Sequence, residues 1–160
     1  MNRLFLYLVV VSMLSSCGNS DELIETDKID KVVYSFGDSS VPPPYHRSYD
    51  IVATTSSISV VVDSYGDIIA EKEVTITSKQ FNGLIDVVNA AKMKNKSKNE
   101  SVGCTGGTSD YLTLFSSDEV IFEGSTYNCG GDKYGNMEGN IESIKSKLKS
   151  MIPNFNALLE

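Results

Sequence analysis

The sequence predicts an α+β domain in which one antiparallel sheet carries two helices on a single face. Three observations lead to this prediction. Short segments rich in β-branched residues lie between turn residues, two other segments carry apolar residues at helical spacing, and the strand segments follow one another closely enough to form hairpins. The predicted order is four strands, a helix, two strands and a second helix, which makes about six strands in all.

The first seventeen residues have the pattern of a secretory signal peptide that ends at a cysteine. Arg3 supplies a positive charge, and residues 4–14 form an apolar run interrupted by one serine. This run suits a signal-peptide core and is too short to cross a hydrocarbon layer of about 30 Å as a helix. Two small residues then come directly before Cys17.

Leu14-Ser15-Ser16-Cys17 resembles the lipobox of bacterial lipoproteins, in which the cysteine becomes the first residue of the mature chain. The resemblance implies that residues 1–16 are removed and that Cys17 is lipidated on its thiol and its amine. Two or three acyl chains hold a protein stably on a membrane. We therefore expect the protein to associate with a membrane through the lipid on Cys17.

Residues 17–30 form an acidic stretch behind the lipidated cysteine. Acidic residues at this place are similar to the export signal of surface lipoproteins of the Bacteroidota, and they are equally typical of a flexible tether. The location implied is the outer membrane, on its periplasmic face or on the cell surface. Residues 31–160 are then enough for one domain with a sizeable core and too few for two ordinary domains.

The domain is predicted to begin with a run of four strands. Their segments are rich in Val, Ile, Thr and Tyr and cover residues 31–36, 48–53, 58–62 and 68–77. The turn between the last two contains Gly66, which supplies the positive φ that hairpins favour. We therefore expect the last three strands to form an antiparallel meander.

Behind these strands, Ser78 is the predicted N-cap of the first helix. Five apolar residues follow at i, i+3, i+4, i+7 and i+10, namely Phe81, Leu84, Ile85, Val88 and Ala91. The helix is expected to end near Met93. Four alternating lysines at residues 92–98 are interpreted as a helix end that continues into a solvated loop, with contact to anionic lipid or lipopolysaccharide as the alternative.

The second half is predicted to contain a hairpin closed by a disulfide. Its strands are residues 111–115 and 120–123, folded about residues 116 and 117. This centre places Cys104 opposite Cys129, and glycines beside both allow the backbones to approach. Two cysteines besides Cys17 in an oxidising compartment favour a disulfide.

The final predicted helix begins after Asn140 and stops before Pro153. One of its faces is apolar, through Ile141, Ile144, Leu148 and Met151.

Composition excludes several classes of function. The net charge is −7 at pH 7, so the chain is a poor ligand for nucleic acid, whose binding depends on neutralising phosphates. One histidine and two free thiols do not make a zinc site. The acidic turns at residues 63–67 and 130–136 lack the spacing of a calcium loop. We expect neither metal nor cofactor.

The candidate binding segment is a rigid, proline-rich stretch. It consists of Pro42, Pro43, Pro44, Tyr45, His46 and Arg47. Three prolines fix φ and remove amide donors, which predicts an extended, exposed segment instead of a central strand. Rigidity lowers the cost of binding, and Tyr and Arg are common interface anchors. An ordered crossing that only sets the sheet geometry is the alternative.

These observations favour a lipid-anchored, non-enzymatic accessory or binding protein of the envelope, whose ligand the sequence does not identify and for which an envelope protein is a candidate partner. The sequence contains neither a Gly-x-Ser-x-Gly elbow nor a His-Glu-x-x-His motif, so an enzymatic function would depend on His46 alone. The other hypothesis is an inhibitor of a hydrolase, such as a lysozyme or a protease, with the proline segment or the Gly-rich loops as its inhibitory edge. The oligomeric state is left open.

Overall fold

The computed structural model describes residues 28–100 and 104–160. The expected signal peptide, the lipidation site at Cys17 and all but the last three residues of the expected tether lie outside these ranges. Within them, no helix is both long enough and apolar enough to cross a membrane.

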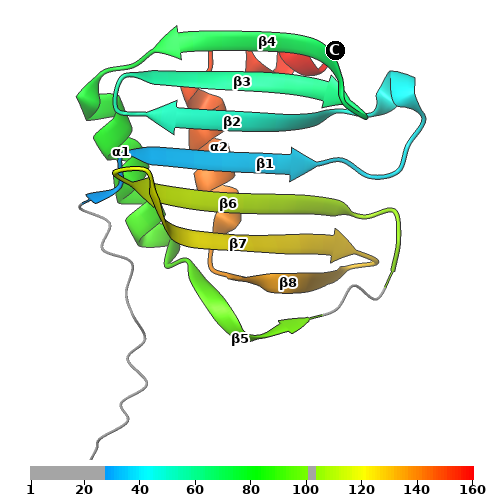
Figure 1. The fold of residues 1–160 in the computed structure, drawn as a ribbon. Coiled ribbons are helices and arrows are strands. Elements are labelled where there is room, and N and C mark those ends of the chain that lie inside the picture. The colour runs from blue at the N-terminus through cyan, green and yellow to red at the C-terminus, as the bar shows by residue number, and fades with distance from the viewer. Residues whose placement is uncertain (1–27, 101–103) are drawn as a thin grey trace, which may run out of the picture.

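One eight-stranded antiparallel sheet forms the body of the structure, in the order β4-β3-β2-β1-β6-β7-β8-β5. The first four strands are β1 (Lys31–Gly37), β2 (Ser48–Thr54), β3 (Ser57–Ser64) and β4 (Asp67–Thr75). The others are β5 (Lys94–Glu100), β6 (Thr108–Ser116), β7 (Glu119–Cys129) and β8 (Asp132–Glu138). Both helices, α1 (Ser78–Ala91) and α2 (Ile141–Met151), lie behind the sheet in Figure 1. The α+β prediction is confirmed, but the prediction of about six strands is wrong.

The two missed strands pair with each other at one edge of the sheet. The lysine-rich stretch is β5 and not a loop: α1 ends at Ala91, Lys92 turns the chain with a φ of 50°, and Lys94 then pairs with Glu138 of β8. Such a strand has no apolar face to reveal it, because main-chain pairing forms it and charged side chains suit an edge. Strand β8 begins after a tight turn in which Gly130 and Gly131 have positive φ.

The predicted meander is confirmed and extends over four strands. Its β3–β4 turn has positive φ at Tyr65 and Gly66, 53° and 93°, as a two-residue hairpin requires. Alternate side chains of each strand point towards the helices, so that β3 buries Ile58, Val60 and Val62.

The helices use the apolar faces that the sequence predicts. Helix α1 buries Phe81, Leu84, Val88 and Ala91, and α2 buries Ile141, Ile144, Leu148 and Met151. The predicted cap of α1 is one residue off, because Thr77 is the N-cap and forms a capping box with Gln80. Asn140 caps α2 as predicted, accepting from the amide of Ser143.

The hairpin of β6 and β7 is confirmed, but its predicted register is wrong. Its turn residues are Ser117 and Asp118, both at positive φ, and a bulge follows Leu114, so that Thr108 pairs with Asn128. Cys104 therefore lies beyond the end of β6 rather than opposite Cys129. The loop nevertheless folds back, and a disulfide joins Cys104 to Cys129 with their Cα atoms 6.2 Å apart.

Gly107 makes this return possible. A Cβ atom at Gly107 would collide with the carbonyl oxygen of Asn128 and the Cβ of Cys129. The absence of a side chain there lets the loop pass close to β7 and brings the two thiols together.

Candidate functional site

The connection between β1 and β2 carries an exposed surface that we term the proline ledge, made of Pro42, Pro43, Pro44 and Tyr45. Pro43–Tyr45 form a single turn of 3₁₀ helix, η2, and the side chain of Tyr45 is 74% exposed. The stretch is exposed and is not a strand, as predicted, but it is a turn and not an extended segment. The proline at the start of η2 has the φ that such a turn needs.

His46 lies beneath the ledge and is buried. Its ring stacks on that of Tyr65, with the centroids 3.9 Å apart and the planes at 23°. Nε2 lies 3.4 Å from the hydroxyl of Ser48, and Nδ1 has no hydrogen-bond partner within residues 28–100 and 104–160. The histidine thus supports the ledge from inside instead of facing solvent.

Three hydrogen bonds fix the ledge to the β3–β4 hairpin and to itself. The hydroxyl of Ser64 donates to the carbonyl of Pro43 at 2.8 Å, and the hydroxyl of Tyr65 donates to the carbonyl of Val41 at 2.6 Å. Within the turn, the amide of Tyr45 donates to the carbonyl of Pro42 at 2.9 Å. The exposed side chains therefore project from a backbone that is held at several points.

Arg47 binds within the chain rather than projecting with the ledge. Its Nε donates to the carbonyl of Leu159 at 3.0 Å, and Nη2 donates to the carbonyl of Glu160 at 3.1 Å. Its amide donates to the carboxylate of Asp38 at 2.9 Å. The structure thus places the six predicted residues in one loop but in different environments: four exposed, one buried and one half-buried.

Sequence reasoning missed two residues that extend the exposed apolar surface. Tyr65, in the β3–β4 turn, is 57% exposed, and Ile68, at the start of β4, is 65% exposed. The sequence signal was Tyr65-Gly66 at the predicted hairpin turn, because the first position of such a turn favours Asn, Asp or Gly over a bulky aromatic residue.

The surroundings of His46 do not form a catalytic arrangement. In a Ser-His-acid triad, the second ring nitrogen is held by a carboxylate and the serine hydroxyl is accessible to substrate. Here Nδ1 has no such partner in the described part of the chain, and the hydroxyl of Ser48 also accepts the amide of Asp38 at 3.0 Å. Among the described residues, no group of three or more His, Cys, Asp or Glu side chains is placed to hold a metal ion.

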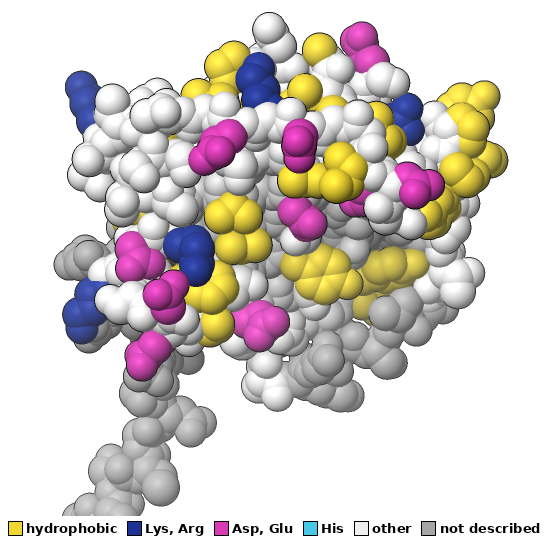
Figure 2. Space-filling view, turned by 45° about the horizontal axis from the view of Figure 1, so that its top comes forward, with side chains coloured by type: hydrophobic (Ala, Val, Ile, Leu, Met, Phe, Trp, Pro, Cys, Tyr) yellow, Lys and Arg dark blue, Asp and Glu magenta, His cyan; other side chains and the backbone are white. Residues whose placement is uncertain are grey.

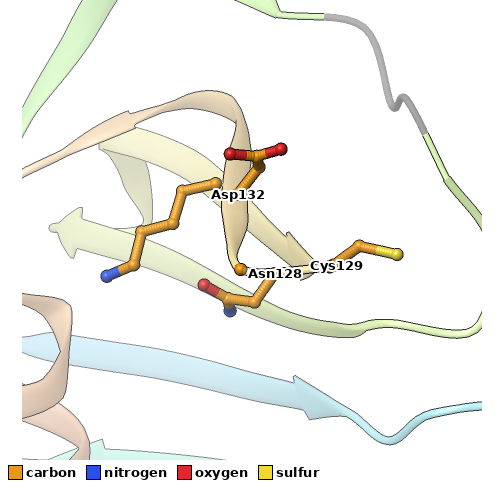
Figure 3. A pocket seen from close by; sticks show the side chains of 6 residues that line it. Asn128, Cys129 and Asp132 are labelled. Carbon is orange, nitrogen blue, oxygen red and sulfur yellow. The ribbon is translucent and has the colours of Figure 1, made fainter.

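A hollow of about 310 Å³ lies at the β7–β8 turn beside the disulfide, lined by residues 128–133. Figure 3 shows the labelled side chains of Asn128, Cys129 and Asp132 pointing in different directions, so they do not converge on one point. A ligand site needs polar groups that converge. The hollow is therefore a feature of the turn.

A buried polar cluster lies between the sheet and α2. The carboxylate of Asp110 accepts from the hydroxyl of Tyr34 at 2.5 Å and from the amide group of Asn128 at 3.1 Å, and Nζ of Lys145 lies 3.4 Å away. Burial raises the pKa of Tyr34, and the hydrogen bond to Asp110 raises it further. Burial also raises the pKa of Tyr49, whose hydroxyl has no hydrogen-bond partner in the described residues.

Comparison with family models, with curated proteins and with solved structures gives no match.

Proposed function

We propose that the protein is a lipid-anchored, non-enzymatic protein of the bacterial outer membrane that binds a partner protein through the proline ledge. One observation carries the proposal: exposed proline and tyrosine side chains project from a turn that internal contacts hold in place. A preorganised surface loses little conformational entropy on binding, and tyrosine is common at the centres of interfaces.

The environment of His46 supports a binding role over an enzymatic one. The histidine is 6% exposed and is covered by the ring of Tyr65. A general base must come within hydrogen-bond reach of its substrate, which this position does not allow without opening the ledge.

Lipid anchoring is supported by the resemblance of residues 14–17 to a lipobox. We expect Cys17→Ser to release the protein from the membrane fraction, because the substitution removes the thiol that would carry the lipid. The check is membrane fractionation followed by immunoblotting. Unchanged sedimentation of the variant with membranes would contradict the anchor.

Site-specific photocrosslinking in cells tests the binding function. A photoreactive amino acid replaces Tyr45, and a control replaces Val120, which is 53% exposed on the β6–β7 hairpin. We expect one predominant crosslinked protein from position 45 that is absent from position 120. Crosslinks of the same kind from both positions, or none from position 45, would refute the ledge as the binding surface.

The identity of the crosslinked protein separates the two binding hypotheses. A rigid loop that moves little on binding is typical of protease inhibitors, which favours the inhibitor as the second candidate. If the partner is a lysozyme or a protease, the purified protein should abolish its activity at a one-to-one ratio, and Tyr45→Ser should restore that activity. A non-hydrolase partner would favour the accessory role.

A further inference from the structure

The face of the sheet that points away from α1 and α2, which we term the open face, has no helix over it in the part of the chain that the structure describes. Figure 1 is drawn from this side, with both helices behind the sheet. Figure 2 shows this face obliquely, with acidic and hydrophobic side chains intermingled and Lys and Arg side chains among them. Such a surface fits the docking of a partner, and its chemistry indicates which kind.

Four exposed carboxylates are distributed over the open face. Val61 pairs with Asp50 on one side and with Glu71 on the other, so the two acids flank it on neighbouring strands. Glu73 follows Glu71 on the same side of β4, and Glu123 lies opposite Thr113. None of these four carboxylates forms a salt bridge or a side-chain hydrogen bond with another described residue.

Positive charge on this face lies at the end of β1 and on the outer strand β5. In β1 to β4, β6 and β7, alternation places one basic side chain on the open side, that of Lys31 at the end of β1. Its Nζ is occupied, because it lies 3.3 Å from the carboxylate of Asp118 and 4.2 Å from the ring centre of Phe115. On the outer strand β5, Lys94 points to the same side and lies 3.7 Å from the carboxylate of Glu138. Over β2, β3 and β4 the open face therefore presents a negative potential to a partner.

A shallow depression of about 210 Å³ lies on the same face over β6, β7 and β8. Its lining includes Tyr111, Thr113, Glu123, Ser125 and Asn136. Tyr111 pairs with Ser125 and Thr113 with Glu123, so Tyr111 and Glu123 are diagonal neighbours on adjacent strands. The ring of Tyr111 is 51% exposed.

An aromatic ring beside a carboxylate is the arrangement that receives a lysine or arginine side chain. The ring contacts the aliphatic stem or the guanidinium plane, and the carboxylate accepts a charge-assisted hydrogen bond from the cation. Asn136 Oδ1 already accepts the amide of Ser125 at 2.8 Å, which leaves Glu123 as the charged acceptor in the depression.

We infer that the open face docks a protein surface rich in lysine and arginine, with one such side chain inserted between Tyr111 and Glu123. A second copy of the chain does not fit, because two acidic faces repel each other and the net charge is −7. An anionic lipid surface is repelled for the same reason. This inference goes beyond the proposed function, since it concerns a surface other than the ledge.

The test uses the full chain in a non-ionic detergent and an eight-residue peptide of alternating arginine and serine. Binding is followed by the backbone amide shifts of the protein. We expect the largest shifts along β4, β3 and β2 and at the depression, and a strong weakening of binding at high salt. Shifts scattered over acidic residues on all faces would overturn the inference.

Two matched sets of substitutions locate the binding. We expect peptide affinity to fall about tenfold when Asp50→Asn, Glu71→Gln and Glu73→Gln are combined. The amide shifts in the depression should disappear in the double variant Glu123→Gln, Tyr111→Ser. The control changes three exposed acids that do not point to the open face, Asp67, Asp86 and Glu119, to amides and should weaken peptide binding less than about twofold. Equal weakening by both sets would refute the open face.

Tyr45→Ser should leave this titration unchanged, because Tyr45 lies on the ledge. A negative crosslinking result at position 45 would therefore refute only the ledge, and a negative peptide titration would refute only the open face.

Discussion

Asp110 joins groups from three separate elements through one carboxylate. It accepts from Tyr34 on β1 and Asn128 on β7, and it faces Lys145 on α2. Asp110 is only 4% exposed, so water does not reach its carboxylate freely. If the carboxylate is removed, its partners are left without a hydrogen bond that would offset the cost of their burial. The cluster thus fixes where α2 lies on the sheet.

We predict that Asp110→Ala lowers the free energy of unfolding by about 3 kcal/mol, because it leaves the buried hydroxyl of Tyr34 without its acceptor and removes the carboxylate beside the half-buried Lys145. Urea denaturation measures the change. Asp132→Ala, at an exposed carboxylate, serves as the control and should change the free energy by less than about 0.5 kcal/mol. A small effect at Asp110 would mean that water replaces the carboxylate.

A second prediction concerns alkaline pH and the two buried tyrosines. The folded state raises the pKa of both Tyr34 and Tyr49 above the ordinary 10.0. Above pH 10 the unfolded chain therefore releases protons that the native state keeps, and stability falls as the pH rises. The stabilising contribution is complete below pH 10, and each tyrosine accounts for about 1.4 kcal/mol of loss per pH unit above it.

Urea unfolding at pH 8, 10 and 11 measures this slope. Tyr49→Phe should reduce it by about half, and at pH 8 it should not destabilise, because the hydroxyl of Tyr49 has no partner among the described residues. Burial lowers the pKa of Lys149, so this group makes the protein more stable as the pH rises. That gain is complete near pH 10.5, the ordinary pKa of lysine. Identical slopes for the variant and the original protein would contradict a raised pKa of Tyr49 in the folded state.

At the scale of single residues, the sequence predicted well which apolar side chains face the core. It did not predict which contacts the polar side chains make. Apolar spacing reveals a buried face directly. The roles of His46 and Arg47 depend on Tyr65 and on the carbonyls of Leu159 and Glu160, which only the fold brings near them. Asp110 gave no signal at all, because one carboxylate in a strand segment looks like any exposed one.

The N-cap of α1 is Thr77, one residue before the Ser78 predicted from the sequence. In the structure the amide of Gln80 donates to the side chain of Thr77, and the side chain of Gln80 accepts the amide of Thr77. Thr77→Ala should lower the free energy of unfolding by about 1 kcal/mol, whereas Ser78→Ala should change it little. Thermal denaturation of both variants decides between them, and the reverse order would restore Ser78 as the cap.

Elements with their own periodicity were predictable, and those formed by distant pairing were not. The meander and both helices show the spacing of a buried face within a few residues of sequence. Strand β5 is polar throughout, and it becomes a strand only because β8 lies beside it. The signal that remained was the alternation of its lysines, which suits a strand period of two as well as a solvated loop.

The disulfide acts at the scale of the whole molecule, because it closes the loop between two segments 25 residues apart. We predict that replacing Cys104 and Cys129 together by serine lowers the free energy of unfolding by about 3 kcal/mol, mainly by releasing the unfolded chain. Reductant should destabilise the original protein by a similar amount and leave the double variant unaffected. Equal sensitivity of both proteins to reductant would contradict a structural disulfide.

The order of strands could not be predicted from the sequence. Net charge indicated an acidic protein, but it did not reveal that the carboxylates of β2, β4 and β7 share one face. That arrangement follows from the pairing of β1 with β6, which joins the two halves of the chain at the middle of the sheet. Contacts of this kind carry no local pattern.

The central place of β1 also affects the order in which the protein can assemble. On the proposed export route the chain leaves the translocation channel N-terminus first, so β1 to β4 are complete before β6 is available to pair with β1. During this interval β1 is an unpaired edge, open to association with other chains. Helix α1 follows β4 directly and is available to cover the apolar side of the half-built sheet, whereas the exposed edge of β1 has to wait for the second half.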